Sequence, residues 1–201
     1  LEKIGKKLTN KNIFFNSIHK DHILVKLYYS GVCGSQLMEI YGGRNNKKFL
    51  PHMLGHEGSG KVIKTGSNVK KVKEGDKVIL GWIKGKGSES KGCKLLFGDK
   101  IINSGPITTF STYSIISENR IIKMPKNLNY KQAVLFGCAI PTGMGLIFNK
   151  IRPKKNNKIL IYGFGGVGLS SFVACKILGI KNITIIDSSE QKLRYAKKIG
   201  A

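Results

Sequence analysis

The stretch that decides the fold spans residues 158–187 and reads KILIYGFGGVGLSSFVACKILGIKNITIID. Its first residues, Lys158–Tyr162, form a compact apolar run that predicts a buried strand. The glycine-rich segment Gly163–Gly168 predicts a turn directly after that strand. Leu169–Leu178 then shows the apolar spacing of an amphipathic helix, and Gly179 predicts its end.

A second strand and a second helix are expected after this helix. Asn182–Ile186 is another short apolar run that ends at Asp187, and Ser188 is expected to cap a helix running to Lys198. The order strand–helix–strand–helix is typical of a doubly wound parallel sheet. Because two parallel strands alone make a one-sided sheet, we expect the rest of the sheet to lie beyond residue 201.

The glycines of the turn have the spacing G-x-G-x-x-G, and their setting between a strand and a helix makes this pattern specific. Gly163 permits the tight turn, Gly165 lets the backbone approach a pyrophosphate, and Gly168 lets the helix pack on the strand. Gly166 and Val167 complete the motif. The N-terminus of the helix would supply unpaired N–H groups to the anion.

The acidic residue after the second predicted strand indicates which dinucleotide binds. Asp187 would accept hydrogen bonds from the ribose hydroxyls of the adenosine half. Its negative charge would repel a 2′-phosphate, so the sequence predicts binding of NAD rather than NADP. The alternative is a plain glycine turn with an aspartate that caps a helix.

The residues before this stretch contain short strand-like runs separated by turns. The runs are Ile23–Tyr29, Lys61–Lys64, Lys77–Leu80, Thr108–Ile116 and Arg120–Lys123. Their spacing predicts a small antiparallel barrel or sandwich. Tyr130–Asn149 is expected to be helical in two pieces that break near Cys138–Pro141. We therefore expect one domain at residues 1–150, with the connecting helices, and the start of a second at residues 151–201.

The chain is strongly basic, with 35 Lys and Arg against 11 Asp and Glu and a net charge of +24. Such a balance can serve binding to nucleic acid or to a membrane surface. Only Arg44, Arg120, Arg152 and Arg194 are arginines, however, and the lysines are scattered. Arginine is the residue suited to forked phosphate and base contacts. We therefore expect no specific nucleic acid and no membrane, and keep a basic non-catalytic binding module as an alternative.

The cysteines favour a reducing compartment, the cytoplasm. Cys33, Cys93, Cys138 and Cys175 lie far apart with no visible secretory leader, unlike a disulfide framework. Cys175 lies on the apolar face of the predicted helix and is expected in the core. No apolar run reaches the about 20 residues of a transmembrane helix. Because the sequence starts at Leu1 rather than Met and stops as a new pattern begins, we expect a piece of a longer protein.

Three residues form a candidate metal site. Cys33 and Cys138 both lie beside glycine in turn-like segments, and His56 lies between Gly55 and Glu57. Two thiolates and one imidazole are the ligands of a catalytic zinc site, in which one position stays open for water or substrate. The alternative is an ordinary polar histidine and two buried thiols. A dinucleotide fold in the same chain favours the metal, because a Lewis acid assists hydride chemistry.

Taken together, these motifs resemble those of the zinc-dependent alcohol dehydrogenases of the medium-chain dehydrogenase/reductase family, over essentially the whole chain. The resembling segments are Gly31-Val32-Cys33-Gly34-Ser35, Gly55-His56-Glu57-Gly58-Ser59-Gly60 with Gly66 and Val69, Gly75-Asp76-Lys77-Val78, and Gly137-Cys138 with Pro141-Thr142-Gly143. The resemblance implies a two-domain α+β and α/β fold. A GroES-like β-barrel catalytic domain would precede the first half of a Rossmann doubly wound parallel sheet.

The resemblance also implies roles for individual residues. It makes Cys33, His56 and Cys138 the ligands of one catalytic zinc ion. Ser35 falls at the position of the family's proton-relay hydroxyl. Glu57 would lie behind the metal or occasionally bind it, with a solvated acidic side chain as the alternative.

Three further positions would contact substrate or cofactor. Trp82 would line the substrate pocket, with a core tryptophan as the alternative, and Thr142 and Val167 would lie near the nicotinamide. The implied reaction is reversible hydride transfer between an alcohol or polyol and NAD, giving an aldehyde or ketone. A zinc-free NAD(P)H-dependent reductase of the same superfamily is the alternative. The complete protein is expected to be a homo-oligomer, and residues 1–201 alone are expected to be inactive.

The sequence departs from the family's pattern in three places. Gln36 stands where an aspartate is usual, so weaker hydrogen bonding behind His56 is expected. Met38 stands where some members have a relay histidine, so the proton must leave by another path. Between Gly81 and Gly105 the only cysteine is Cys93, so we expect no structural zinc.

Overall fold

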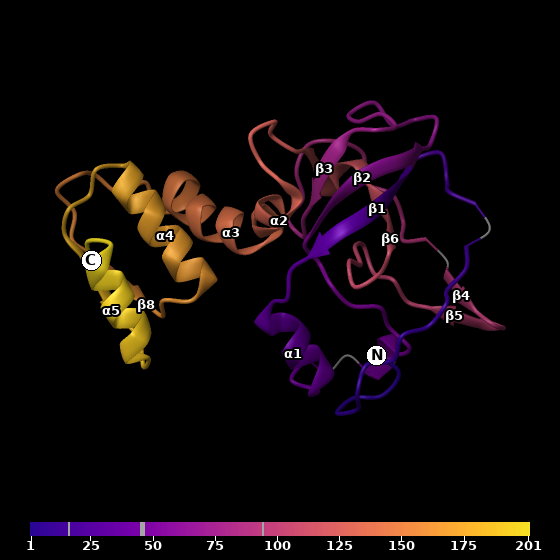
Figure 1. The fold of residues 1–201 in the computed structure, drawn as a ribbon, viewed down its shortest axis with the longest axis horizontal. Coiled ribbons are helices and arrows are strands. Elements are labelled where there is room, and N and C mark those ends of the chain that lie inside the picture. The colour runs from indigo at the N-terminus through magenta and orange to yellow at the C-terminus, as the bar shows by residue number, and fades with distance from the viewer. Residues whose placement is uncertain (16, 45–46, 94) are drawn as a thin grey trace. The chain divides into compact units, whose positions relative to one another are not determined.

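The computed structural model describes residues 1–15, 17–44, 47–93 and 95–201. Contacts divide the chain into two compact units, Leu1–Gly137 and Cys138–Ala201. Figure 1 shows strands at the centre of the first unit, and helices α3, α4 and α5 around strand β8 in the second. The division into domains at residue 150, made from the sequence, stays a prediction.

The first unit is built on a five-stranded antiparallel sheet. Its strands are β1 (His22–Ser30), β2 (Gly58–Thr65), β3 (Lys77–Leu80), β6 (Tyr113–Ser117) and β7 (Ile121–Lys123), in the order β6-β1-β2-β3-β7. Each of the five predicted strands is present. The strand expected over Thr108–Ile116 is shorter, since it begins only at Tyr113.

The core of the first unit consists of β-branched and leucine side chains from these strands and their loops. They are Ile23, Val25, Val62, Val72, Val78, Leu80, Ile107, Ile116 and Ile121. Alternate residues of β1 and β3 contribute to this cluster because successive side chains of a strand point to opposite faces. Gly60 of β2 has no room for a side chain, since a Cβ there would collide with the carbonyl oxygen of Lys26.

Short helices and a hairpin complete the first unit. They are α1 (Gly34–Ile40), the 3₁₀ turns η1 (Lys47–Phe49), η2 (Glu118–Arg120) and η3 (Val134–Gly137), the helix α2 (Tyr130–Ala133), and the hairpin of β4 (Leu95–Phe97) with β5 (Lys100–Ile102). Neither α1 nor the hairpin was expected from the sequence. At seven and three residues per element, these segments are too short to show a clear hydrophobic period.

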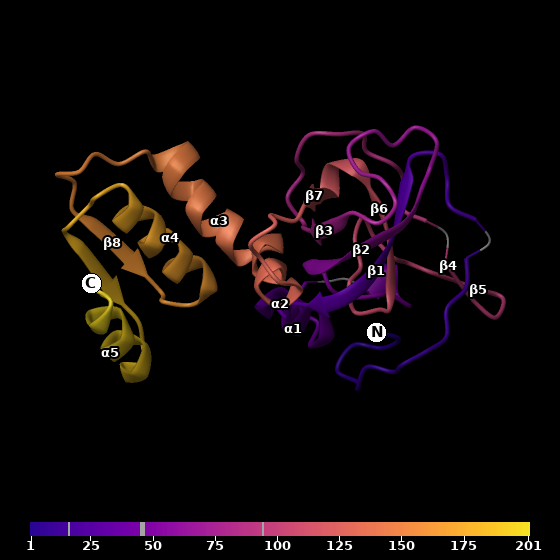
Figure 2. The same ribbon diagram turned by 45° about the horizontal axis from the view of Figure 1, so that its top comes forward.

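The second unit has the predicted order of strands and helices. It consists of α3 (Ala139–Gly145), the π-helical η4 (Leu146–Ile151), β8 (Ile159–Tyr162), α4 (Gly166–Ile177), β9 (Ile183–Ile186) and α5 (Glu190–Lys198). Strands β8 and β9 are parallel, with Ile159 opposite Ile183. In Figure 2, α4 runs beside β8, which it contacts.

Several boundaries in the second unit differ from the prediction by one to three residues. Helix α4 begins at Gly166, inside the segment expected as a turn, and α5 follows Ser189 rather than Ser188. Cys175 is fully buried, as expected, in a cluster that includes Phe164 and Phe172. The edge-to-face packing of these two rings, at 5.8 Å between centroids, fixes the turn against α4.

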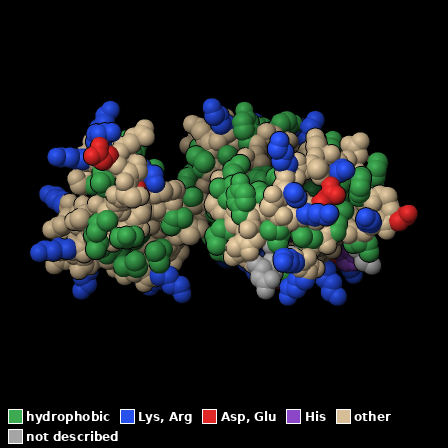
Figure 3. Space-filling model, turned by 90° about the horizontal axis from the view of Figure 1, so that it is seen from below, with side chains coloured by type: hydrophobic (Ala, Val, Ile, Leu, Met, Phe, Trp, Pro, Cys, Tyr) green, Lys and Arg blue, Asp and Glu red, His purple; other side chains and the backbone are tan. Residues whose placement is uncertain are grey.

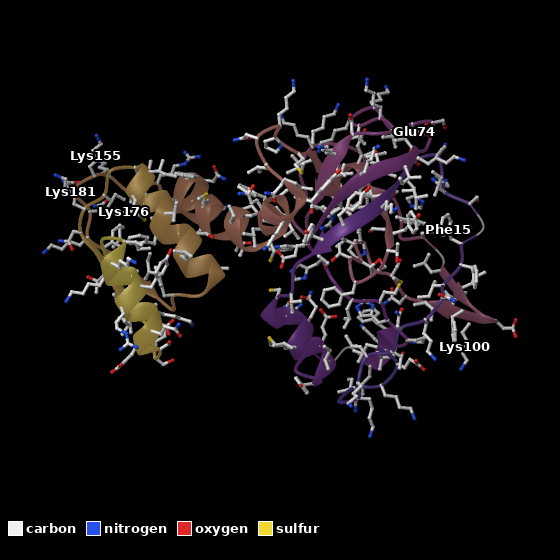
Figure 4. All side chains as sticks on the ribbon, viewed as in Figure 1. Phe15, Glu74, Lys100, Lys155, Lys176 and Lys181 are labelled. Atoms are coloured by element: carbon white, nitrogen blue, oxygen red, sulfur yellow. The ribbon has the colours of Figure 1, made fainter. Side chains whose placement is uncertain are left out.

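The chain carries many basic side chains, with 35 Lys and Arg against 11 Asp and Glu. On the face drawn in Figure 3, Lys and Arg side chains are spread over each unit among hydrophobic and neutral ones. Figure 4 shows Lys155, Lys176 and Lys181 extending outward from the second unit, and Lys100 extending from the hairpin of the first. Within the described residues, no single helix has the length and apolar character to cross a membrane; the consecutive segments Tyr130–Gly137 and Ala139–Ile151 meet that test only when joined.

A buried carboxylate fixes three loops of the first unit. Glu118 is 7% exposed, and its Oε1 accepts hydrogen bonds from the backbone N–H groups of Lys70 (2.7 Å) and Lys71 (2.6 Å). Its Oε2 accepts from the N–H of Ser88 at 3.1 Å. Burial raises the pKa of Glu118, but these hydrogen bonds lower it further than burial raises it, so the net pKa lies below its ordinary value.

Replacing Ile121 by Ala is expected to lower the free energy of unfolding by about 2–5 kcal/mol, because this side chain is fully buried. The same change at the neighbouring Ile122, which is 58% exposed, is expected to change it by less than about 0.5 kcal/mol. Urea unfolding of the complete protein and both variants measures the difference. Equal losses at the two positions would contradict the position of the core.

The stabilising effect of Glu118 is expected to depend on pH. A folded-state pKa below the unfolded value of about 4.3 adds stability above that pH, and the stability is lost as the pH falls through the folded pKa. We therefore expect Glu118→Gln to lower the melting temperature at pH 7, with the gap to the wild type closing towards pH 3. Melting curves across this range measure the gap. A constant gap would show that the carboxylate charge has no part.

Candidate functional site

Cys33 lies where β1 ends and α1 begins. It has an extended backbone and occupies the position immediately before the first turn of α1. Its backbone N–H donates a hydrogen bond of 2.9 Å to Oε1 of Gln36, one turn further on. The thiol is therefore carried by a backbone fixed at both ends, by the sheet and by the helix.

His56 lies just before β2. It follows Gly55, whose left-handed backbone conformation favours glycine. Gly55 has φ +92°, and a Cβ there would collide with Thr109. The ring Nδ1 of His56 lies 2.5 Å from Nε2 of Gln36 and 3.4 Å from Oγ of Ser35. Burial lowers the pKa of His56, although the charge of Glu39 opposes this shift, and the neutral imidazole is the form that binds metals.

Gln36 connects two of the three candidate ligands. It is only 2% exposed, and its amide contacts both the backbone of Cys33 and the ring of His56. The hydrogen bond behind His56 is therefore present in spite of the departure from aspartate.

Cys138 follows directly on Gly137, the last residue of the first unit, and precedes α3. It is 8% exposed, and its carbonyl oxygen accepts a hydrogen bond of 2.7 Å from Oγ1 of Thr142. The one ligand atom that each of Cys33, His56 and Cys138 offers lies within 4.8 Å of the others. Within the described part of the chain, this is the group of such side chains that could hold a metal ion. Its donor set fits a zinc ion with an open position.

Glu57 lies next to this group but is not one of its members. Its side chain is 6% exposed, so the alternative of a solvated acid is wrong. Burial raises its pKa. A Cβ at Gly31 would come within 2.5 Å of the Glu57 side chain, and one at Gly137 within 2.7 Å, so both glycines are needed where Glu57 packs.

The glycine turn of the second unit has the geometry that its sequence predicts. Gly163 has φ +89°, and a Cβ at Gly168 would collide with the carbonyl oxygen of Gly163. A Cβ at Gly165 would meet nothing within 4 Å, so the space in front of the helix is open. Gly166 is the first residue of α4, and a Cβ added there would lie 3.0 Å from the side chain of Ala139.

Asp187 reaches back from the end of β9 to this turn. Its carboxylate accepts hydrogen bonds from the backbone N–H groups of Phe164 (2.6 Å) and Ser189 (2.9 Å), which lower its pKa. Nζ of Lys192 lies 3.4 Å from Oδ2. Lys192 was not among the predicted site residues, since one lysine among many in a basic chain gives no signal of its own.

The remaining predicted site residues are partly exposed. Trp82 is 46% exposed, so the alternative of a core tryptophan is wrong, and its N–H donates to the carbonyl oxygen of Gly137 at 3.3 Å. Val167 is 42% exposed at the start of α4, and Thr142 lies in the middle of α3. Met38 is 50% exposed on α1.

The chain is similar to known proteins over most of its length. Residues 19–126 match the family model described as the alcohol dehydrogenase GroES-like domain. Over its whole length the chain is 31% identical to alcohol dehydrogenase 6 of Peromyscus maniculatus, of which it covers 60%. It is 28% identical, over 90% of its length, to an S-(hydroxymethyl)glutathione dehydrogenase of Photobacterium damsela subsp. piscicida, of which it covers 56%.

The fold also matches that of a solved structure. The benzyl alcohol dehydrogenase of Acinetobacter calcoaceticus superposes with a TM-score of 0.81 at 27% identity, over 94% of this chain and 57% of that one. The chain thus spans about 60% of the length of its relatives. A GroES-like domain followed by the first part of a Rossmann sheet is the fold class predicted from the sequence, and it is confirmed. This chain belongs to the alcohol dehydrogenases of the medium-chain dehydrogenase/reductase family.

Proposed function

We propose that the complete protein is an NAD-dependent zinc alcohol dehydrogenase, which transfers hydride reversibly between an alcohol or polyol and NAD and gives an aldehyde or ketone. The observation that carries this proposal is the group of Cys33, His56 and Cys138, with ligand atoms within 4.8 Å of one another. By the family resemblance, zinc-free reductases of the superfamily usually lack these cysteines and the His-Glu pair, which favours the zinc enzyme. The relatives are named as alcohol dehydrogenases and S-(hydroxymethyl)glutathione dehydrogenases, and these names support an oxidoreductase that acts on alcohols.

The three ligands would hold one zinc ion, which when bound supplies Lewis-acid chemistry that lowers the pKa of an alcohol hydroxyl. Residues of this chain would accept the proton of the substrate hydroxyl and transfer it. Oγ of Ser35 lies 3.4 Å from Nδ1 of the His56 ring, and the family resemblance assigns this hydroxyl to accept the proton of the substrate and pass it on. Glu57 stays behind the ligands as a buried carboxyl group.

The cofactor is proposed to bind at the start of α4. The open space at Gly165 and the unpaired N–H groups of the helix N-terminus suit a pyrophosphate. Asp187 and Lys192 would contact the adenosine ribose, the carboxylate as acceptor and the ammonium as donor. Val167 and Thr142 are assigned to the nicotinamide by the family resemblance.

Five further features are proposed for the complete protein. They are a domain boundary after residue 150, a small-molecule substrate that contacts Trp82, no structural zinc, a homo-oligomeric state and a cytoplasmic location. The substrate classes to test first are those in the names of the relatives, benzyl alcohol and S-(hydroxymethyl)glutathione.

Replacing Cys33 by Ser in the complete protein is expected to reduce bound zinc from about one ion per chain to near zero, because two remaining ligands bind zinc weakly. Alcohol oxidation is expected to be lost, and NADH binding retained. Elemental analysis and fluorescence titration measure these quantities. Cys175→Ala is the matched control, since Cys175 lies in the core of the second unit and should leave the zinc content unchanged. Equal zinc in both variants would refute the assignment.

Replacing Asp187 by Asn is expected to raise the ratio of kcat/KM with NADP to kcat/KM with NAD about tenfold or more, because the change removes the charge that repels a 2′-phosphate. Steady-state kinetics with both cofactors measure the ratio. Glu190→Gln, which removes an exposed charge from the same helix region, is the control. An unchanged ratio would mean that Asp187 only caps the turn through Phe164 and Ser189.

A further inference from the structure

The segment that carries Trp82 has no regular structure of its own. Residues 81–89 follow β3 and contain neither helix nor strand. Leu80, the last residue of β3, pairs with Ile121, the first of β7. Because the strands are antiparallel, the residues that leave β3 lie beside those that precede β7, which are the three residues of η2. We name residues 81–89 the Trp82 loop.

The turn η2 is buried although all three of its residues are polar. Glu118, Asn119 and Arg120 are 7%, 6% and 9% exposed. Polar side chains are costly to bury unless they make hydrogen bonds, so their partners explain their position. Three of those partners, Trp82, Ser88 and Glu89, are in the Trp82 loop.

The far end of the Trp82 loop is fixed by the first two residues of η2. Glu118 accepts from the N–H of Ser88 at 3.1 Å, and the N–H of Asn119 donates to the carbonyl oxygen of Ser88 at the same distance. The carbonyl oxygen of Asn119 accepts from the N–H of Gly85 at 2.7 Å. Residues of η2 thus act in turn as hydrogen-bond acceptor, donor and acceptor toward the loop. These contacts restrain the backbone of the loop at Gly85 and Ser88.

Arg120 makes two of the hydrogen bonds that fix the near end of the loop. Its carbonyl oxygen accepts from the N–H of Gly81 at 3.0 Å, and its guanidinium Nη1 donates to the carbonyl oxygen of Trp82. The other branch, Nη2, lies 3.8 Å from a carboxylate oxygen of Glu89, at the end of the loop. One forked side chain thus spans both ends of the Trp82 loop.

The peptide of Trp82 is consequently fixed on both sides. Its carbonyl oxygen is bonded to Arg120, and its N–H is bonded to the carbonyl oxygen of Gly137, the residue before the ligand Cys138. Gly81 allows this approach, since a Cβ there would lie 2.8 Å from the same carbonyl oxygen. The backbone of Trp82 is therefore held beside Gly137, and its side chain is 46% exposed.

We propose that Arg120 is a positioning residue for Trp82 and thereby determines which alcohols the enzyme accepts. This inference rests on the proposed function, in which Trp82 contacts the substrate. Arg120 acts through the peptide of Trp82 and touches neither the substrate nor the reacting atoms. Its Nε has no hydrogen-bond partner in the described structure, so the two Nη contacts account for an arginine at this buried position. A lysine, with a single ammonium point, cannot contact both Trp82 and Glu89.

The test uses Arg120→Lys in the complete protein, with Arg194→Lys as the matched control. Arg194 is 74% exposed and pairs with Glu190 on α5. For Arg120→Lys we expect the ratio of KM for benzyl alcohol to KM for ethanol to change about tenfold, the effect of one lost charge-assisted hydrogen bond. The kcat for ethanol and the zinc content should stay within twofold of the wild type.

Glu89→Gln is a second variant at an exposed position, where the change should not impair folding. It should shift the same KM ratio in the same direction.

A second readout is independent of catalysis. Trp82 is the only tryptophan in this chain, and its emission is isolated as the difference between each protein and its Trp82→Phe form. Acrylamide should quench Trp82 more strongly in Arg120→Lys than in the wild type or the control. Unchanged quenching would overturn the inference, as would a KM ratio that stays constant in an active enzyme. A wild type that oxidises no alcohol would refute the proposed function alone, since quenching still decides the position of Trp82.

Discussion

The close packing of two glycines against Glu57 is the constraint on which the candidate metal site depends. Gly31 lies two residues before Cys33, Glu57 follows His56, and Gly137 precedes Cys138. The Gly31 N–H donates to the carbonyl oxygen of Glu57 at 3.1 Å, and neither glycine has space for a Cβ beside the Glu57 side chain. Three segments that are distant in sequence therefore meet at one buried residue, Glu57, and each carries one of the candidate ligands.

This constraint explains what could be predicted from the sequence. The strand–turn–helix around Gly163 was predictable because its glycines act locally, and the structure shows the left-handed Gly163 and the crowded Gly168. The ligands were recognisable by residue type and by resemblance to a family. The position of Gln36 behind His56 was expected from the resemblance. The contacts of Lys192 and Arg120 could not be predicted, since they depend on which loops lie side by side. A short helix such as α1 and a three-residue hairpin strand likewise depend on tertiary packing for their existence.

Gln36 gives this site a chemistry of its own. An amide can offer an oxygen or an NH2 group, and here Oε1 is bonded to the Cys33 N–H while Nε2 faces the His56 ring. When an imidazole binds a metal through Nε2, its Nδ1 carries the proton and needs an acceptor. Gln36 can provide one by turning its amide, at the cost of the bond from Cys33. A carboxylate would accept from both groups at once.

The ligand set is the central claim, and X-ray absorption at the zinc edge tests it most directly. The complete protein, purified without chelator, should give a zinc spectrum with two sulfur neighbours at about 2.3 Å and one imidazole nitrogen at about 2.0–2.1 Å. The remaining position should be filled by oxygen. That result would match Cys33, His56 and Cys138, whose ligand atoms lie within 4.8 Å of one another. Four sulfur neighbours, or a folded protein that binds NADH without zinc, would contradict it.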